Sequence, residues 1–297
     1  MSAHNHSGAS PAVTTATLRS LKGSRPIVVV TAYDAPSGRL ADAAGVDVVL
    51  VGDSLGMVVL GHDSTLPVTM DDMLRHTAAV SRGVERALVV ADMPFLSYQV
   101  SRKAAVEHAG RFLAEAGASA VKVEGGATIA RTVRKIVDAG IPVMGHVGLT
   151  PQSVHALGGY RVQAKEAAAA QQLLDDCRAL QDAGAFAVVL ECIPAELAEY
   201  VTAEIEIPTI GIGAGAGCDG QVQVFHDLLG YGTSRTPKHA QHYAEVGDVI
   251  RDAIARYAGD VREGRFPRDE HCTRMDPDAL RQFERAREGG GTVAGSD

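Results

Sequence analysis

The sequence predicts a (β/α)8 barrel of the TIM type, an α/β fold in which eight parallel strands alternate with helices. Three observations predict it. Short apolar runs alternate with stretches of helical periodicity along most of the chain, which is typical of a parallel sheet. Glycine precedes several of the apolar runs, in AGVD, AGAS, AGIP and AGAF, as expected where a helix ends in a repeated βα unit. The 297 residues also suffice, because such a barrel takes about 250 residues as one domain.

The apolar runs give the expected strands. They are rich in Val, Ile, Leu and Ala, as strands covered on both faces usually are. An eighth strand is expected at 221–225, but only GAGAGCDG separates it from the seventh, which is too short for a full helix. The barrel is therefore expected to be irregular there. The first seven strands are expected at 27–32, 46–51, 87–91, 120–123, 142–146, 187–190 and 208–212.

A doubly wound open sheet is the structural alternative to the barrel. No GxGxxG follows the first strand to support a dinucleotide-binding version of that sheet.

Helices are expected between the strands, and two of them begin with capping signals. Asp34 stands before Pro36 as a cap stands before a first-turn proline, and Thr69 and Asp72 have the spacing of a capping box. The expected helices include 36–44, 71–82, 101–116, 128–139 and 164–183.

The two ends of the chain contain little that a core would bury. Ser, Ala, Thr and His dominate residues 1–17, and the last residues read GGGTVAGSD. We therefore expect a disordered arm over 1–17, one catalytic barrel domain over 18–287 and a disordered tail over 288–297.

Composition and charge exclude several classes of partner. The net charge is -8 and no Lys/Arg run occurs, so nucleic acid is not an expected partner. No apolar run approaches the roughly 18 residues of a membrane span, and none resembles a signal peptide. The four cysteines lack CxxC spacing, which favours reduced thiols in the cytoplasm. Small-molecule substrates are expected instead.

Carboxylates follow three of the expected strands. Asp53, Asp92 and Glu124 stand at strand ends, where barrel enzymes place their reactive groups on one rim. Several carboxylates are the oxygen ligands that Mg²⁺ needs. Each could instead cap a helix or pair with a lysine, but three in matching positions favour a metal site.

Further polar residues stand at the same rim. Lys122 and Glu124 are two apart on one strand and point the same way, so Lys122 either binds a substrate carboxylate or forms a buried pair with Glu124. Glu191 has apolar neighbours and is the candidate base, although it could instead cap a helix near Pro194. His146 could donate to a substrate, or it could satisfy a loop carbonyl.

Around these residues the chain strongly resembles the ketopantoate hydroxymethyltransferase family. The resemblance spans residues 18–266, and chance agreement over so many ordered motifs is not credible. The segments that carry it are TAYDAPS, VGDSLGMVVLGHDSTLPVT, ADMPFLSY, VKVEGG, GIPVMGHVGLTPQSVHALGGYRVQAK, GAFAVVLECIPAELA and IPTIGIGAGAGCDGQVQVFHDLLG.

This resemblance implies a barrel of the phosphoenolpyruvate/pyruvate type with bound Mg²⁺, and commonly a homodecamer. It implies transfer of a hydroxymethyl group from 5,10-methylenetetrahydrofolate to 3-methyl-2-oxobutanoate, through a Mg²⁺-stabilised enolate, to give 2-dehydropantoate for pantothenate synthesis. The roles it implies are metal binding by Asp53, Asp92 and Glu124, substrate binding by Asp53, Ser54, Asp92 and Lys122, proton abstraction by Glu191 and an auxiliary role for His146.

Three features depart from the family pattern: Arg75 replaces a usual Tyr, Ala164 replaces a common Gly, and HCTRM around Cys272 replaces an aromatic-containing ending. They leave the named ligands intact. Two rival functions remain. One is a Mg²⁺-dependent lyase or mutase that needs no folate, and the other is a catalytically silent assembly subunit, which the presence of all four carboxylates disfavours.

Overall fold

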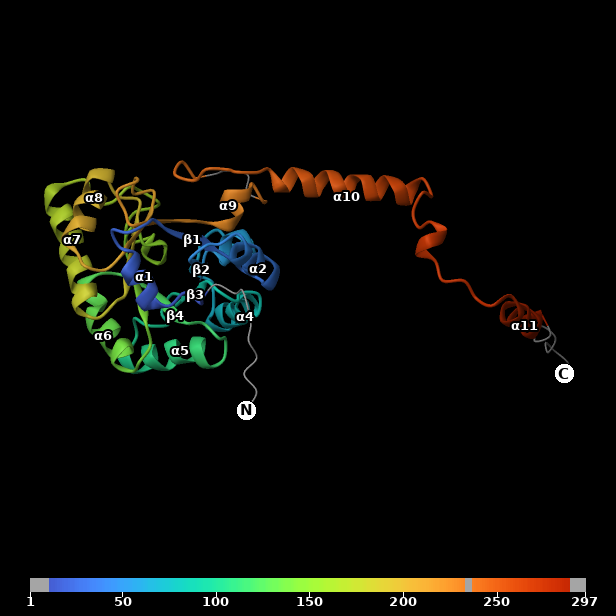
Figure 1. Cartoon of the computed structure of the whole chain (residues 1–297), viewed down its shortest axis with the longest axis horizontal. Coiled ribbons are helices and arrows are strands. Elements are labelled where there is room, and N and C mark those ends of the chain that lie inside the picture. Colours follow the sequence, from blue (N-terminus) through green and yellow to red (C-terminus); the bar gives the residue numbers. More distant parts are fainter. Residues whose placement is uncertain (1–10, 233–236, 289–297) are drawn as a thin grey trace, which may run out of the picture. The chain divides into compact units, whose positions relative to one another are not determined.

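Eight parallel strands form a closed ring in sequence order, with β1 paired to both β2 and β8 (Figure 1). The computed structural model describes residues 11–232 and 237–288. The predicted (β/α)8 barrel is confirmed, and the open doubly wound sheet is excluded. The strands are β1 (Ile27–Thr31), β2 (Val48–Val51), β3 (Leu88–Asp92), β4 (Ala120–Glu124), β5 (Val143–Gly148), β6 (Ala187–Glu191), β7 (Thr209–Ile212) and β8 (Gly220–Gln223).

Helices surround the ring of strands (Figure 1). The predicted capping box from Thr69 to Asp72 is present. Asp34, predicted as the cap before Pro36, is the N-cap of α2 and also forms a capping box with Ser37. The helices of this part are α1 (Thr15–Leu21), α2 (Ala35–Ala43), α3 (Leu55–Val58), α4 (Met70–Ser81), α5 (Arg102–Ala114), α6 (Ala130–Asp138), α7 (Ala167–Asp182), α8 (Ala195–Glu204) and α9 (Phe225–Leu229), with the 3-10 turns η1 (Ala127–Ile129) and η2 (Pro151–Ser153).

The start of α7 differs from the prediction of a helix from residue 164. Ala164 has a φ of 56°, a left-handed conformation that costs a non-glycine residue about 1–2 kcal/mol. The chain cannot continue as a right-handed helix through that residue, so α7 begins only at Ala167. The same conformation explains why a glycine suits this position.

The barrel is irregular between its last two strands, as predicted. Only turns connect β7 to β8, and β8 begins at Gly220 rather than at residue 221. A Cβ at Gly220 would lie 2.4 Å from the carbonyl oxygen of Ile27. Glycine therefore allows β8 to approach β1 closely enough to close the ring.

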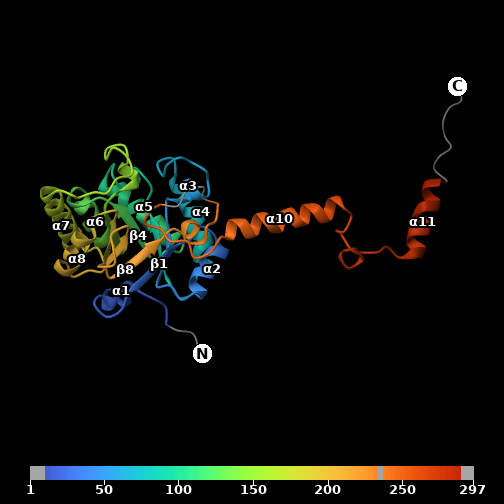
Figure 2. The same ribbon diagram turned by 90° about the horizontal axis from the view of Figure 1, so that it is seen from above.

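One end of the barrel is closed by α1, which lies at the lower end of β1 and β8 in Figure 2. Leu18 is only 1% exposed and packs with the side chains inside the barrel. Lys22 donates to the carbonyl of Thr202 at 2.8 Å and pairs with Asp219 at 2.7 Å. The barrel unit thus includes helical residues before residue 18, the predicted start of the barrel domain. Of the predicted arm, residues 1–10 lie outside the described residues.

The last part of the chain forms a unit of its own. Contacts divide the chain into Met1–Glu245 and Val246–Asp297, whereas the sequence placed 18–287 in one domain. The second unit contains α10 (Val246–Arg262), the turn η3 (Asp269–His271) and α11 (Pro277–Glu288). The predicted tail, apart from Glu288, lies outside the described residues. Nowhere in the described ranges is a helix long and apolar enough to cross a membrane.

Candidate active site

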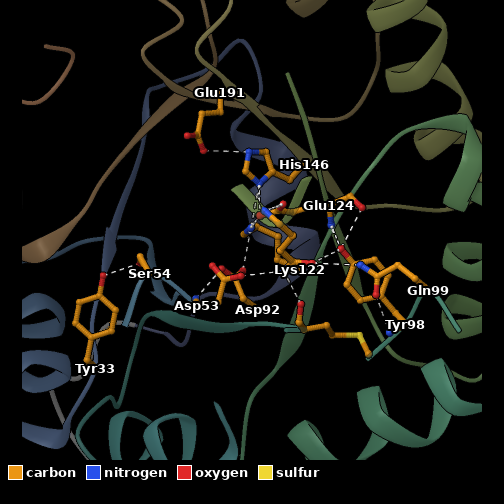
Figure 3. A network of polar contacts seen from close by, with 12 residues as sticks. Tyr33, Asp53, Ser54, Asp92, Tyr98, Gln99, Lys122, Glu124, His146 and Glu191 are labelled. Carbon is orange, nitrogen blue, oxygen red and sulfur yellow. Dashed lines mark hydrogen bonds and ion pairs between the residues drawn. The ribbon is translucent and has the colours of Figure 1, made fainter. Parts of the chain in front are cut away.

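Strand register brings the predicted site residues together inside the barrel. Asp92 is the partner of Lys122 across β3 and β4, and Glu124 is the partner of His146 across β4 and β5. Partner residues on adjacent strands point to the same side of the sheet. Figure 3 accordingly shows these side chains turned toward one another.

Lys122 lies at the centre of this cluster. Its Nζ is 3.0 Å from Asp92 Oδ1, 3.9 Å from Glu124 Oε1 and 3.1 Å from His146 Nδ1. Burial lowers the pKa of Lys122, but the charges of Asp92, Glu124 and Asp53 outweigh burial and raise it. The ammonium is therefore charged, and the buried pair with Glu124 that the sequence left open is part of a larger network.

His146 connects this network to Glu191. Because Lys122 is a donor, His146 Nδ1 accepts in the neutral ring and the ring proton lies on Nε2. Nε2 is 3.1 Å from Glu191 Oε2. Burial and the charge of Lys122 lower the pKa of His146, but hydrogen bonds with Glu124 and Glu191 outweigh them and raise it to about 9. A protonated ring forms ion-pair contacts with Glu191 and with Glu124, whose Oε1 lies 3.5 Å from Nδ1.

Glu191 is held by this contact and does not cap a helix. The first residue of α8 is Ala195, and its N-cap, Pro194, makes no side-chain capping bond. The carboxylate of Glu191 is 15% exposed, whereas His146 is 3% exposed. The helix-capping alternative for Glu191 is therefore excluded, and its partly exposed carboxylate lies above the buried cluster.

Asp53 joins the cluster through hydrogen bonds. Its backbone N–H donates to Asp92 Oδ2 at 3.1 Å, and its own Oδ2 accepts from Gln152 Nε2 at 2.9 Å. Burial and the charges of Asp92 and Glu124 raise the pKa of Asp53 well above its ordinary value. Burial also raises the pKa of Asp92, although Lys122 opposes the change.

Ser54 lies beside the cluster without contacting its carboxylates. Its hydroxyl is 2.9 Å from the hydroxyl of Tyr33, which also accepts a hydrogen bond from Thr31. Figure 3 shows this pair at one side of the carboxylates. Tyr33 thereby fixes the orientation of Ser54.

Two residues of the site, Gln152 and Tyr98, were not predicted. Gln152 contacts Asp53 and Glu124, and Tyr98 contacts Gln152 and the backbone of Glu124. Both lie in segments of the family resemblance, ADMPFLSY and TPQSVH. Neither follows an apolar run directly, so a search restricted to strand ends passes over them.

The charges of the site suit a divalent cation. Asp53, Asp92, Glu124 and Glu191 supply four carboxylates, whereas Lys122 and a protonated His146 supply two positive charges. Burial and, after it, the charges of Asp92 and Glu124 raise the pKa of Asp53. Carboxylate oxygens alone are the donors that Mg²⁺ prefers. The donor chemistry and charge of these residues therefore fit Mg²⁺.

The side chains are not arranged as a finished metal cage. Within the described ranges, no group of three or more His, Cys, Asp or Glu side chains is placed to hold a metal ion as it stands. The ammonium of Lys122 lies between two of the predicted ligands, Asp92 and Glu124. The fit to Mg²⁺ therefore rests on charge and ligand type.

None of the three departures from the family pattern is among the residues of the cluster. The side chain of Arg75 is 74% exposed and pairs with Asp72 at 3.5 Å. Ala164 holds the turn before α7. Cys272 is exposed, and all four cysteines are free.

Comparison with known sequences identifies a family. A sequence model of the ketopantoate hydroxymethyltransferase family matches residues 12–269. The 3-methyl-2-oxobutanoate hydroxymethyltransferase of Carboxydothermus hydrogenoformans is 57% identical over 272 residues, covering 91% of this chain and 99% of the relative. The enzyme of the same name from Gluconacetobacter diazotrophicus is 59% identical over 254 residues, covering 86% of this chain and 91% of the relative.

Two solved structures of other enzymes have a similar fold. One is 2,3-dimethylmalate lyase, a member of the PEP mutase/isocitrate lyase superfamily. Its TM-score is 0.55 at 19% sequence identity, and the match covers 96% of this chain and 100% of that chain. Phosphonopyruvate hydrolase, in complex with oxalate and Mg²⁺, has a TM-score of 0.56 at 15% identity, covering 92% and 96%. At such identities the likeness concerns the fold alone, the predicted (β/α)8 barrel.

Proposed function

The chain belongs to the ketopantoate hydroxymethyltransferase family, and from this premise we propose its full reaction. The enzyme transfers a hydroxymethyl group from 5,10-methylenetetrahydrofolate to 3-methyl-2-oxobutanoate. The products are 2-dehydropantoate, a precursor of pantothenate, and tetrahydrofolate, with one water consumed in each turnover. The observation that carries the proposal is the buried cluster of Asp53, Asp92, Glu124 and Lys122, joined to Glu191 through His146.

The carboxylates of Asp53, Asp92 and Glu124 would hold Mg²⁺. A bound Mg²⁺ would withdraw electron density from the 2-oxo acid and make its C3 proton more acidic. Lys122 and Ser54 bind the oxo acid, Lys122 as a buried cation and Ser54 as a hydroxyl oriented by Tyr33. The charge of Lys122 also favours the negative charge that develops when C3 loses its proton.

Glu191 removes the C3 proton. Its side chain is partly exposed above the buried cluster, and the Oε2 atom lies 3.1 Å from Nε2 of His146. The C3 carbon then forms a bond to the methylene carbon of the folate. As this bond forms, one of the two bonds from that carbon to folate nitrogens breaks, and water supplies the hydroxyl oxygen as the second of these bonds breaks. The proton taken from C3 and one proton of the water end on the two released nitrogens. His146 is auxiliary, because it positions the base.

Product analysis tests the reaction. The purified chain is incubated with Mg²⁺ and 3-methyl-2-oxobutanoate, with and without methylenetetrahydrofolate. We expect 2-dehydropantoate only in the complete mixture, and none after EDTA removes the metal. Cleavage of another oxo acid without folate would instead identify a lyase or mutase.

The role of Glu191 has its own test. Glu191→Gln should keep Mg²⁺ and oxo-acid binding but lose exchange of the C3 proton with D₂O, because the amide cannot accept that proton. The turnover rate should fall by about 10²–10⁴-fold. Exchange is followed by NMR. Glu196→Gln, an exposed change in the first turn of α8, is the matched control. Wild-type exchange in Glu191→Gln would remove Glu191 from the base role.

We also propose a homo-oligomer in the cytoplasm, a decamer by the family resemblance. An apolar stripe on α10 supports the assembly. Ile250, Ile254, Tyr257 and Val261 recur at helical spacing, and their exposed fractions are 37%, 61%, 57% and 46%. Such a stripe is typical of a helix that packs against a partner. The free cysteines suit the cytoplasm.

A further inference from the structure

Gln152 bonds to two of the carboxylates that form the proposed metal site. It lies in the 3-10 turn η2, which follows β5, and is 5% exposed. Its side-chain Nε2 donates to Asp53 Oδ2 at 2.9 Å, and its backbone N–H donates to Glu124 Oε2 at 3.0 Å. One residue thus bonds to carboxylates from two different strands.

The orientation of the Gln152 amide is fixed by its surroundings. The same Nε2 lies 2.9 Å from the carbonyl oxygen of Met93. A backbone carbonyl can only accept, so the atom facing it must be the NH₂ group. Oε1 therefore points the other way, where it accepts from Tyr98 at 2.8 Å and from Gln99 at 3.3 Å. It follows that Nε2 donates to Asp53.

Each of the three carboxylates then has one oxygen occupied by an N–H group. Asp53 Oδ2 and Glu124 Oε2 accept from Gln152, and Asp92 Oδ2 accepts from the backbone of Asp53. The second oxygens of Asp92 and Glu124 face Lys122. For Asp53 Oδ1, no hydrogen bond or ion pair is found in the parts of the chain that the structure describes. Each carboxylate thus presents one oxygen to the site.

We infer that Gln152 is a positioning residue that restricts Asp53 and Glu124 to one metal-binding oxygen each and thereby favours Mg²⁺ over Ca²⁺. The inference rests on the proposed function, because it concerns the cation proposed there. Mg²⁺ keeps near-octahedral geometry and needs positions for water and substrate, whereas Ca²⁺ takes more oxygens and often binds both oxygens of a carboxylate.

Direct metal binding tests the inference. Gln152→Met keeps the volume and the backbone N–H to Glu124 but removes the donor to Asp53. Metal-free protein is titrated with Mg²⁺ and separately with Ca²⁺ by calorimetry, with 3-methyl-2-oxobutanoate present. Mg²⁺ affinity should fall by about 10–100-fold, as when other partners of metal ligands are removed. Ca²⁺ affinity should fall less, so the ratio of the two affinities should change by about tenfold or more.

Gln181→Met is the matched control. Gln181 Oε1 accepts from the backbone N–H groups of Glu206 and Ile207 before β7, at the opposite end of the strands from the site. This variant should lower the melting temperature and leave both metal affinities unchanged. A second variant, Gln152→Asn, keeps an amide that is one methylene too short to reach Asp53, and should change the affinity ratio in the same direction.

The outcomes separate this inference from the proposed function. If the wild-type chain binds Mg²⁺ and the affinity ratio is unchanged in both Gln152 variants, the inference about Gln152 is wrong but the proposed function is not affected. Gln152 then has a structural role. A wild-type chain that binds neither ion overturns both. A changed ratio in the Gln152 variants but not in Gln181→Met supports the inference.

Discussion

Lys122 shows how much of this site depends on a single buried charge. Its ammonium contacts Asp92, Glu124 and His146, and its side chain is 5% exposed. Removing one partner of a buried ion pair leaves the other charge uncompensated, which costs more than the pair itself contributes. Lys122 therefore stabilises the metal-free site as well as serving the proposed chemistry.

Lys122→Met should lower the free energy of unfolding in EDTA by about 3–5 kcal/mol, because three buried carboxylates lose their shared cation. Urea denaturation followed by circular dichroism measures the change. Lys103→Met is the control, since Lys103 pairs with Glu107 on the surface and should contribute no more than about 1 kcal/mol. A loss as small as in the control would show that Lys122 does not balance these charges.

The strand-end rule predicted the charged residues of the site because charge after an apolar run is visible in the sequence. The rule predicted four residues that the strand register places together: Asp92, Lys122, Glu124 and His146. Gln152 could not be predicted in this way. Its importance comes from contacts with Asp53 and Met93, which lie far from it in sequence, and an uncharged amide carries no such signal.

At the scale of the elements, hydrogen bonds to Asp42 connect the end of a helix to the start of a strand. Asp42, near the end of α2, accepts from the backbone N–H groups of Glu85, Arg86 and Ala87 just before β3. Burial raises the pKa of Asp42, but these N–H groups outweigh burial and lower it below the ordinary value of 3.8. The ionised form is thus the one that stabilises the fold.

Asp42→Asn should lower the free energy of unfolding at pH 7 by about 1–3 kcal/mol, because hydrogen bonds to a charged acceptor are lost. A carboxylate with a lowered folded-state pKa contributes its stability above the unfolded value and loses it as the pH falls through the folded value. The difference from wild type should therefore shrink below about pH 4. Urea titrations at pH 7 and pH 3 measure it, with the exposed Asp71→Asn as control. An equal difference at both pH values would contradict the assignment.

The pairing of β5 with β6 sets the position of the proposed base. Gly148 is the partner of Glu191, has a φ of 90°, and would place a Cβ 2.3 Å from the carbonyl oxygen of Glu191. Only glycine allows the two strands to approach this closely.

Gly148→Ala should lower the turnover rate by about 10²-fold, because displacement of Glu191 by about 1 Å spoils its alignment. Steady-state kinetics measure the effect. Gly140→Ala is the matched control, since Gly140 has a φ of 84° but nothing within 4 Å of a Cβ. Gly140→Ala should therefore lower the stability of the fold but not the turnover rate. Equal turnover in the two variants would show that the contact with Glu191 does not matter.

The elements were largely predictable because apolar strands and capping boxes have strong local signals. The seven clearest runs all became strands, and both capping signals were correct. The start of α7 was wrong because the backbone conformation of Ala164 depends on the loop around it. Alanine favours helices, so the residue type did not indicate that the helix begins later.

For the whole molecule, the number and order of apolar runs predicted the closed barrel. The sequence did not indicate that residues from Val246 onward form a second unit, because the helical periodicity of α10 is the same whether it packs on its own barrel or on a partner. Its apolar stripe is the feature that connects the fold to the proposed assembly.

Ile254→Asp should reduce the size of the assembly, because a charge in the centre of the α10 stripe cannot be buried in an apolar contact. Light scattering after size-exclusion chromatography measures the mass. Arg256→Asp, which adds an aspartate on another face of the same helix, is the control and should keep the wild-type mass. An unchanged mass in Ile254→Asp would show that the stripe is not part of the interface.

The pairing of β1 with β8 has a consequence for synthesis on the ribosome. Of the eight strands, the ribosome makes β1 first and β8 last. The ring therefore cannot close until Gly220–Gln223 has left the exit tunnel. Until then, β1 and the newest strand present unpaired edges, which can pair with other chains.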